Sequence, residues 1–322
     1  MKIIFFGSDD FALTTLNGLL ASHHQILACV TQPDRPRGRG LKVGGSPIKE
    51  LAAARKLPLF QPQGLLDPVF VNAMNSFRCD LFVVVAYGQI LPAAVLSIPY
   101  VCALNVHASL LPRYRGAAPV NWAILNGEKE TGVSIIKMND RMDAGDIVRQ
   151  DSVTIGPDET SPELRQRLAK LGTEVLVKTI NSLEKNDYIL TVQDHRRVTF
   201  APKLTKELGL ISWGKSALTI HNQVRGLLPW PSAYTFFQGK QIKILETEVE
   251  DAQNHSQPAG SVIGITAKGI RVAASPGILL IKKLQPESGK AMEAVSFASG
   301  FHLKVAERFE FFPQEKMQER SE

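Results

Sequence analysis

The chain has 322 residues, of which 44% are hydrophobic and 21% charged. This composition is typical of a globular protein with a sizeable core, and the length favours two domains. The net charge of +6 is compatible with a nucleic-acid partner, although many proteins without such a partner are also basic.

The three cysteines, Cys29, Cys79 and Cys102, show no CxxC spacing. They therefore indicate neither a disulfide framework nor a zinc site, and a reducing compartment is expected. The start of the chain lacks the pattern of a signal peptide, and no apolar run has the length of a membrane span. We expect a cytoplasmic protein without a membrane partner.

The chain opens with a predicted strand at residues 2–6, a turn at 7–10 and a helix at 11–20. This start resembles a nucleotide-binding fold. It lacks the G-x-G-x-x-G pattern, so a dinucleotide site is poorly supported.

A second predicted strand at residues 25–31 leads into a loop at 32–42 that is rich in Pro, Gly and Arg. The density of Pro and Gly predicts no regular structure there. The loop carries three arginines and a lysine against the single acid Asp34. A solvated surface loop is one interpretation, and a loop that contacts a phosphate backbone is the other.

Helices are predicted at residues 46–56 and 67–77, with a short strand at 57–60 between them. The continuous apolar run at 80–86 is typical of a parallel strand that is covered on both faces. The turn at 87–92 leaves this strand at the edge of the sheet where ligands bind in open α/β folds.

The stretch at residues 101–112 begins as an apolar strand and ends with two polar side chains, Asn105 and His107. Residues two apart share one face of a strand, so these side chains point together from its end. They could be satisfied core residues. A catalytic histidine needs a third group to orient it, and Asp143 is the candidate acid.

A helix at residues 119–125, strands at 133–138 and 147–155 and a long helix from Ser161 complete the first part of the chain. The alternation of strands and helices predicts a doubly wound α/β sheet. The pattern then loosens, and short strand-like runs separated by glycines follow, which favour a small β-barrel. We expect domains at 1–189 and 207–322, a linker at 190–206, and a frayed charged tail from Phe309.

Three groups of residues, in this order and spacing, resemble the signature of the folate-dependent formyltransferases. They are Asn105-x-His107, Ser109-Leu110-Leu111-Pro112-x-x-x-Gly116 and Asp143-x-Gly145-Asp146. Within that superfamily the chain resembles the methionyl-tRNA formyltransferase family over nearly its whole length. Further similar segments lie at 5–7, 31–40, 84–92, 115–119, 130–133, 203–207 and 229–231. One departure is Ala108, where many members have glycine.

The resemblance implies a Rossmann-like catalytic domain followed by an OB-like barrel that helps to hold transfer RNA. It implies 10-formyltetrahydrofolate as the co-substrate, initiator methionyl-tRNA as the acceptor, no metal, and a monomer. The implied catalytic residues are Asn105, His107 and Asp143. Those implied to bind folate are Ser109, Leu110, Leu111, Pro112, Tyr87, Gly88 and Ile90. Those implied to bind transfer RNA are Arg39, Arg37, Lys42 and Lys206.

Two other functions remain open from the sequence. The same Asn-His-Asp set could serve a formyltransferase that acts on a sugar amine or a purine precursor, or a hydrolase that uses water. A non-enzymatic RNA-binding protein with a degenerate α/β domain is the third possibility, and the presence of all three polar residues argues against it.

Overall fold

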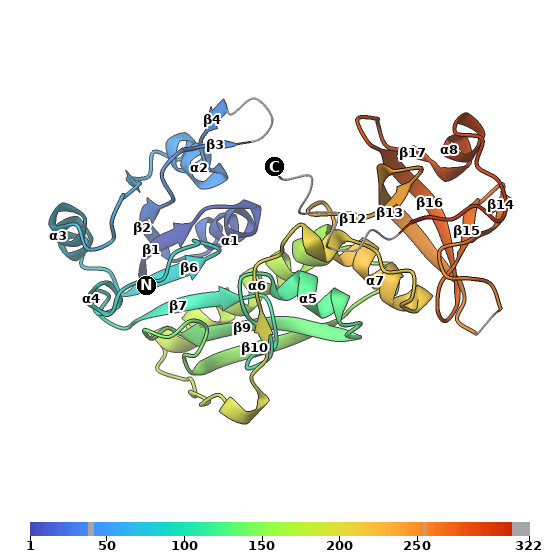
Figure 1. The fold of residues 1–322 in the computed structure, drawn as a ribbon. Coiled ribbons are helices and arrows are strands. Elements are labelled where there is room, and N and C mark those ends of the chain that lie inside the picture. The colour runs from blue at the N-terminus through green and yellow to red at the C-terminus, as the bar shows by residue number, and fades with distance from the viewer. Residues whose placement is uncertain (38–41, 254–255, 311–322) are drawn as a thin grey trace. The chain divides into compact units, whose positions relative to one another are not determined.

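The computed structural model describes residues 1–37, 42–253 and 256–310 (Figure 1). The chain divides into two compact units. The first unit comprises Met1–Pro119, Glu130–Thr154 and Leu164–Pro202. The second comprises Val120–Lys129, Ile155–Glu163 and Lys203–Glu322. No helix in the described part of the chain is both long enough and apolar enough to cross a membrane.

The first unit is built on one large sheet, whose described strands lie in the order β10-β9-β7-β6-β1-β2-β5. Their bounds are β1 (Lys2–Gly7), β2 (Gln25–Val30), β5 (Leu59–Phe60), β6 (Leu81–Val85), β7 (Cys102–His107), β9 (Glu130–Lys137) and β10 (Ile147–Thr154). The five strands from β7 to β5 are parallel, whereas β9 and β10 are antiparallel to their neighbours. The chain builds outward from β1 to β5 and then returns to β6, so the strand order reverses between β1 and β6. Ligands bind at this point in such folds.

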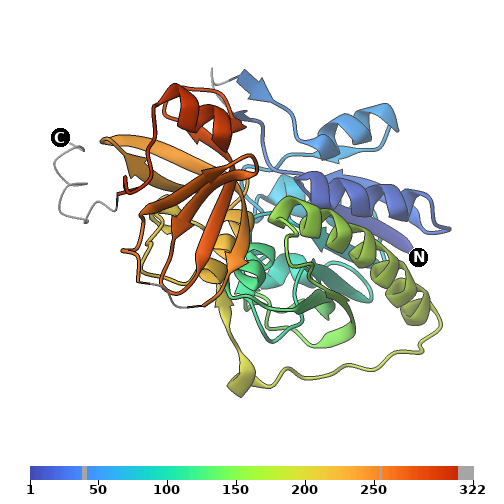
Figure 2. The same cartoon turned by 90° about the vertical axis from the view of Figure 1, so that its right-hand side faces the viewer.

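Helices cover both faces of this sheet, as the sequence predicts. On one face, Phe70 and Met74 of α3 (Pro68–Ser76) and Val95 of α4 (Ala93–Leu96) pack with Ile4 and Phe6 of β1. On the other face lie α1 (Asp10–Leu20) and α6 (Ser161–Glu184), which run side by side in Figure 2. These two helices are so close that a Cβ added to Gly18 would lie 2.1 Å from Cγ2 of Thr173.

The basic segment after β2 contains regular structure, so the prediction of an irregular loop at 32–42 was wrong. β3 (Arg35–Arg37) pairs antiparallel with β4 (Lys42–Gly44), and α2 (Pro47–Ala54) follows. Pro36 fits because both strands of a two-stranded hairpin have a free edge, where a missing N–H is tolerated. Residues 38–41, between the two strands in sequence, lie outside the described part.

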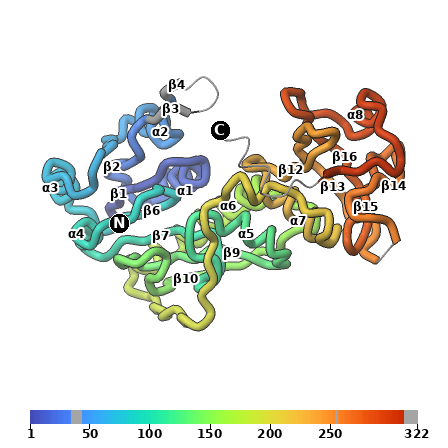
Figure 3. Tube along the Cα trace, viewed as in Figure 1, coloured from blue at the N-terminus to red at the C-terminus, as the bar shows by residue number. Residues whose placement is uncertain are grey.

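Residues 191–201, which we call the strap, lie in the first unit although the expected linker includes them (Figure 3). The strap contains the short helix η1 (His195–Arg197) and strand β11 (Phe200–Ala201). β11 pairs in parallel with β8 (Arg115–Gly116), and Thr191 exchanges both backbone hydrogen bonds with Ile147. The strap is therefore hydrogen-bonded near both of its ends to other segments of the first unit.

The second unit contains an antiparallel sheet with the described order β12-β13-β16-β15-β14, and β17 pairs with β16. Its elements are η2 (Glu207–Gly209), α7 (Ala217–Gly226), β12 (Ala233–Phe237), β13 (Lys240–Asp251), β14 (Val262–Thr266), β15 (Gly269–Ala273), β16 (Ile278–Pro286), β17 (Met292–Glu293) and α8 (Ala294–Gly300). Residues 308–310 bridge both sheet edges, because Arg308 pairs with Ser261 and Glu310 with Phe236. The sheet is thus closed into the expected barrel.

Phe309 was expected to begin a frayed tail, and this was wrong. Its side chain is 2% exposed and stacks on Trp213 with ring centroids 5.9 Å apart. The aromatic ring belongs to the barrel core, and that burial holds the segment that closes the barrel. Residues 311–322 lie outside the described part.

Two segments that precede residue 189 belong to the second unit. They are 120–129, which contains most of α5 (Pro119–Leu125), and 155–163. The buried Arg225 of α7 holds the latter segment, because its Nη1 donates to the carbonyls of Gly156 and Glu159 at 3.2 and 2.8 Å. The buried His221 of the same helix contacts the carbonyl of Pro157 through Nε2 at 3.2 Å.

Candidate active site

The site lies at the carboxyl end of β7, next to the point where the strand order reverses. Asn105 pairs in register with Val84 of β6, and His107 pairs with Ser134 of β9. Asn105 is half-buried and His107 is 6% exposed. The alternation of side chains along β7 places both on one face, as the sequence predicts.

Asp143 comes from the loop between β9 and β10 and reaches both of these side chains. Its Oδ1 accepts a hydrogen bond from Asn105 Nδ2 at 3.3 Å and lies 3.5 Å from His107 Nδ1. Its Oδ2 accepts a hydrogen bond from the backbone N–H of Gly116 at 2.8 Å. An amide and an imidazole from β7 and a carboxylate from the β9–β10 loop therefore meet at one place.

The imidazole of His107 is held from two sides. Nε2 lies 2.9 Å from the carbonyl oxygen of Tyr114. Because a carbonyl oxygen only accepts, Nε2 carries the hydrogen in this contact. Nδ1 faces the carboxylate of Asp143, and the two form an ion pair when the ring is protonated. This arrangement suits a histidine that moves a proton or presents a positive charge.

The turn at residues 109–112 is fixed by the hydroxyl of Ser134. Ser134 Oγ donates to the carbonyl of Ser109 at 2.6 Å and accepts from the N–H of Leu111 at 3.0 Å. The side chains of Ser109 and Leu111 are buried, whereas those of Leu110 and Pro112 are half-exposed. Of the four, Leu110 and Pro112 have side-chain surface that a ligand could contact.

The turn after β6 presents backbone and one apolar side chain. Tyr87 is 2% exposed, and its ring packs edge-on against Phe6 at 5.5 Å. The side chain belongs to the buried core, and this burial raises the pKa of Tyr87 to about 12. Gly88 is exposed with φ +85°, and Ile90 is 63% exposed. A ligand here would contact the backbone at Gly88 and the side chain of Ile90.

The residues expected to bind RNA are only partly described. Arg37 and Lys42 are directly opposite one another in the β3–β4 pair. Arg39 lies outside the described residues. Lys206 is exposed and directly precedes η2 in the second unit.

The sequence did not predict the contacts of Tyr114 and Gln193. Tyr114 acts through its carbonyl, which any residue would supply, so no side-chain pattern could reveal it. Gln193 is buried in the strap and contacts the loop of Asp143. Its sequence neighbours are polar and without periodicity, which favoured a linker.

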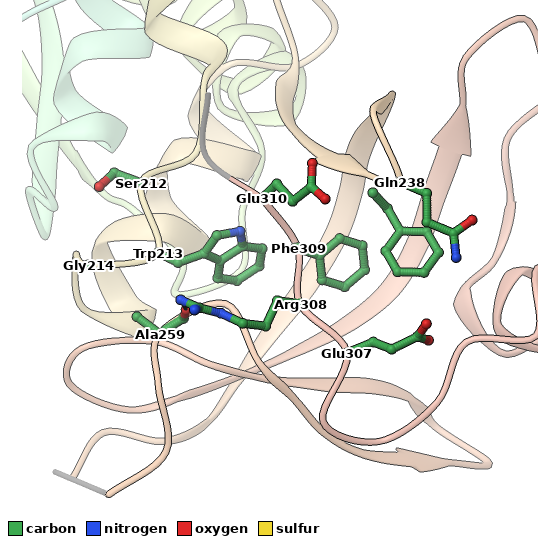
Figure 4. Close-up of a pocket in the computed structure, with 10 residues that line it drawn as sticks. Ser212, Trp213, Gly214, Gln238, Ala259, Glu307, Arg308, Phe309 and Glu310 are labelled. Atoms are coloured by element: carbon green, nitrogen blue, oxygen red, sulfur yellow. Dashed lines mark hydrogen bonds between the residues drawn. The ribbon is translucent and has the colours of Figure 1, made fainter. Parts of the chain in front are cut away.

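Two other features of the described residues lie outside this site. His23, His24 and Glu184 are close enough to share a metal ion. A cavity of about 690 Å³ opens in the second unit (Figure 4), and no predicted site residue lines it. The side chains of Trp213, Phe237 and Phe309 are almost fully buried. These three side chains thus leave little aromatic surface exposed to the cavity.

Two family profiles match the chain. Residues 1–180 match the formyl transferase family, and residues 203–302 match the formyl transferase C-terminal domain. A methionyl-tRNA formyltransferase from Alkaliphilus oremlandii is 44% identical over 300 residues, which are 93% of this chain and 96% of the relative. The chain belongs to the methionyl-tRNA formyltransferase family. A second member, from Geobacter sulfurreducens, is 41% identical and is matched over 96% of both chains.

Solved structures with the same fold include more distant proteins. WlaRD, a sugar 3N-formyl transferase, superposes with a TM-score of 0.66 at 18% identity and covers 87% of this chain and 97% of its own. HypX from Aquifex aeolicus, solved in complex with tetrahydrofolic acid, has a TM-score of 0.64 at 16% identity and covers 97% of this chain and 51% of its own. At these identities the structures support the fold alone. The resemblance of this chain to the methionyl-tRNA formyltransferases is confirmed by the closer relatives.

Proposed function

We propose that the protein transfers the formyl group of 10-formyltetrahydrofolate to the α-amino group of methionine on initiator tRNA. The observation that carries the proposal is the convergence of Asn105, His107 and Asp143 in a member of the methionyl-tRNA formyltransferase family. Residues 1–189 are assigned to catalysis, 190–206 to the linker and 207–322 to RNA binding. We place the protein in the cytoplasm as a monomer.

The chemistry requires a stabilised oxyanion and a controlled proton. The amine nitrogen forms a bond to the formyl carbon, and the bond from that carbon to the folate nitrogen then breaks. Asn105 Nδ2 has two hydrogens. One is directed at Asp143, and we assign the other to the carbonyl oxygen as its charge grows. Loss of such a donor costs about 10²–10³ in rate in comparable enzymes.

His107 and Asp143 would control the proton that moves from the attacking amine to the leaving nitrogen. The attacking amine loses one proton, and the leaving nitrogen of the folate gains one, so the net transfer releases none. The buried imidazole is fixed by Tyr114 and can relay this proton or stabilise the same oxyanion. Asp143 keeps the ring in one orientation through its contact with Nδ1.

The residues proposed for the co-substrate fit a flat, partly apolar heterocycle. Gly88 leaves space, because a Cβ added there would meet no atom within 4 Å. Ile90, Leu110 and Pro112 offer apolar surface at the carboxyl ends of neighbouring strands. Backbone groups in the turn after β6 would supply the polar contacts that select one ring orientation.

The RNA contacts are proposed for Arg39, for Arg37 of β3 and Lys42 of β4, and for Lys206. Several cations in one segment bind phosphates mainly by counterion release, so this part of the affinity should weaken with salt. The remaining acceptors, a sugar amine, a purine precursor or water, are alternative outcomes of the same test.

The test supplies 10-formyltetrahydrofolate with one acceptor at a time: methionyl initiator tRNA, an aminosugar nucleotide, glycinamide ribonucleotide, or buffer alone. We expect formyl-methionyl-tRNA as the product, with much slower hydrolysis in buffer. Preferential formylation of another acceptor, or hydrolysis at the same rate with and without RNA, would refute the proposed function.

A further inference from the structure

The strap contains one buried glutamine whose hydrogen bonds all converge on the active site. Gln193 is 3% exposed. Its Nε2 donates to the carbonyls of Asp143 and Gly145, at 2.9 and 2.7 Å. Its Oε1 accepts from Nε and Nη2 of Arg115, at 3.1 and 2.7 Å. Both hydrogens and both lone-pair directions of the amide are therefore used.

The β9–β10 loop, to which Gln193 donates its hydrogen bonds, has a backbone conformation that contacts from other segments must stabilise. Asp143 has φ +51°, in the left-handed region that non-glycine residues seldom occupy. Such a residue persists only when its surroundings hold it. Two carbonyls bound by one buried amide, on either side of Ala144, restrict the backbone that aims the Asp143 carboxylate.

The same strap also holds the other partner of the catalytic histidine. Thr199 Oγ1 accepts a hydrogen bond from the N–H of Tyr114 at 2.9 Å, and the Thr199 carbonyl accepts one from the N–H of Arg115 at 2.9 Å. The Tyr114 carbonyl bonds His107. Both groups that orient the imidazole, the Tyr114 carbonyl and the Asp143 carboxylate, are thus attached to residues 191–201.

We propose that Gln193 is a positioning residue for formyl transfer, which acts by fixing the Asp143 carboxylate against His107 and Asn105. This inference rests on the proposed function and deepens it. Gln193 touches neither substrate in this assignment. Its loss should therefore lower kcat while the KM values for folate and RNA stay nearly constant.

Two substitutions separate this role from simple support of Arg115. Gln193→Ala removes both halves of the amide. Gln193→Glu keeps an acceptor for Arg115 but replaces the donor with an oxygen that faces the carbonyls of Asp143 and Gly145. We expect both variants to lose about 10- to 100-fold in kcat, the scale of a misplacement of about 1 Å. Gln193→Glu at wild-type kcat would overturn the proposal.

A matched control exists in the second unit. Gln223 is also buried, and its Nε2 donates to two carbonyls, those of Leu208 and Leu210, at 2.8 and 3.0 Å. Gln223→Ala makes the same deletion in a side chain whose donor binds Leu208 and Leu210 instead of the Asp143 loop. We expect it to lower the melting temperature but to keep kcat within about threefold of wild type. An equal loss of kcat in this control would show that truncation of any buried glutamine suffices, and would overturn the proposal.

A double-mutant cycle with Asp143→Asn tests whether Gln193 affects kcat through the Asp143 carboxylate. If Gln193 works through the carboxylate, Gln193→Ala should change kcat by less than about twofold once that carboxylate is gone. A full additional loss in the Asp143→Asn background would refute positioning through Asp143. If the wild type formylates another acceptor preferentially, the proposed function is wrong. The role of Gln193 is then tested by the same double-mutant cycle with that acceptor.

A crystal structure of Gln193→Ala decides the inference even if no acceptor is formylated. We expect the Asp143 carboxylate to leave contact with Gly116 N–H and His107 Nδ1. An unchanged loop would overturn the proposal.

Discussion

The carboxylate of Asp143 accepts hydrogen bonds from two donors and faces the imidazole of His107, so its replacement by an amide has a predictable effect. Gly116 N–H and Asn105 Nδ2 donate to its two oxygens, and His107 Nδ1 faces the same oxygen as Asn105. In Asp143→Asn one oxygen becomes an NH₂ group, which only donates. Whichever way the amide turns, at least one donor loses its acceptor and the negative charge is absent.

The expected loss follows from these contacts. A hydrogen bond to a charged group contributes about 1.5–3 kcal/mol, and about 1.4 kcal/mol corresponds to a factor of ten in rate. Loss of one such contact in the transition state should thus lower kcat by about 10- to 150-fold. Folate binding should remain, because the substitution leaves the turns at 87–92 and 109–112 intact.

Single-turnover formylation of methionyl-tRNA at saturating folate measures this step without product release. Asp140→Asn is the control, because Asp140 is an exposed carboxylate in the same loop. We expect the control to react like wild type. If Asp143→Asn reacts at a near-normal rate while it binds folate, the carboxylate has no part in the chemistry.

Three further predictions concern stability and RNA binding. Gly116→Ala should destabilise the fold in denaturant unfolding by about 1–3 kcal/mol or more, because Gly116 has φ +121° and its Cβ would lie 2.7 Å from the Ala201 carbonyl. Burial lowers the pKa of His221 below 6.5. The contribution of the neutral imidazole to stability is therefore complete above pH 6.5 and is lost as the pH falls below it. His221→Gln should make the melting temperature depend less on pH in this range. Arg39→Ala should weaken RNA binding more than folate binding, as measured by titration of each ligand.

Controls for these experiments are available in the chain. Gly64→Ala tests the cost of a glycine substitution where an added Cβ meets nothing within 4 Å. His302→Gln tests an exposed histidine. Near-wild-type stability of Gly116→Ala would contradict the first prediction. The second would be contradicted if the melting temperature of His221→Gln fell at low pH as that of the wild type does. An unchanged dissociation constant for RNA in Arg39→Ala would contradict the third.

The sequence predicted the main elements of the first unit because local patterns carry them. The apolar run at 80–86 becomes β6, and the segment from Ser161 becomes α6. The period of two along β7 was sufficient to place Asn105 and His107 on one face. The contact with Asp143 is different, because it depends on how the β9–β10 hairpin folds back. The need for an orienting acid and the family resemblance both pointed to Asp143, but neither could show that it contacts His107.

The features that local patterns missed are stabilised by distant partners. The hairpin that contains Arg37 and Lys42 forms despite its Pro and Gly content, because backbone pairing across the two strands outweighs local propensity. The strap has no periodicity, yet it is ordered by pairs with Ile147 and with β8. Phe309 lies in a charged stretch, but its ring in the barrel core and the backbone bridges of Arg308 and Glu310 hold the segment.

The two carbonyls that bind Arg225 come from a part of the chain about 70 positions upstream of it. A fragment that starts at residue 203 would keep the guanidinium but lack both of these acceptors, and an interior cation without them is costly. The barrel is consequently not an independent folding unit that starts at residue 203. A gene fusion or truncation made there would remove Gly156 and Glu159, whose carbonyls the buried Arg225 needs.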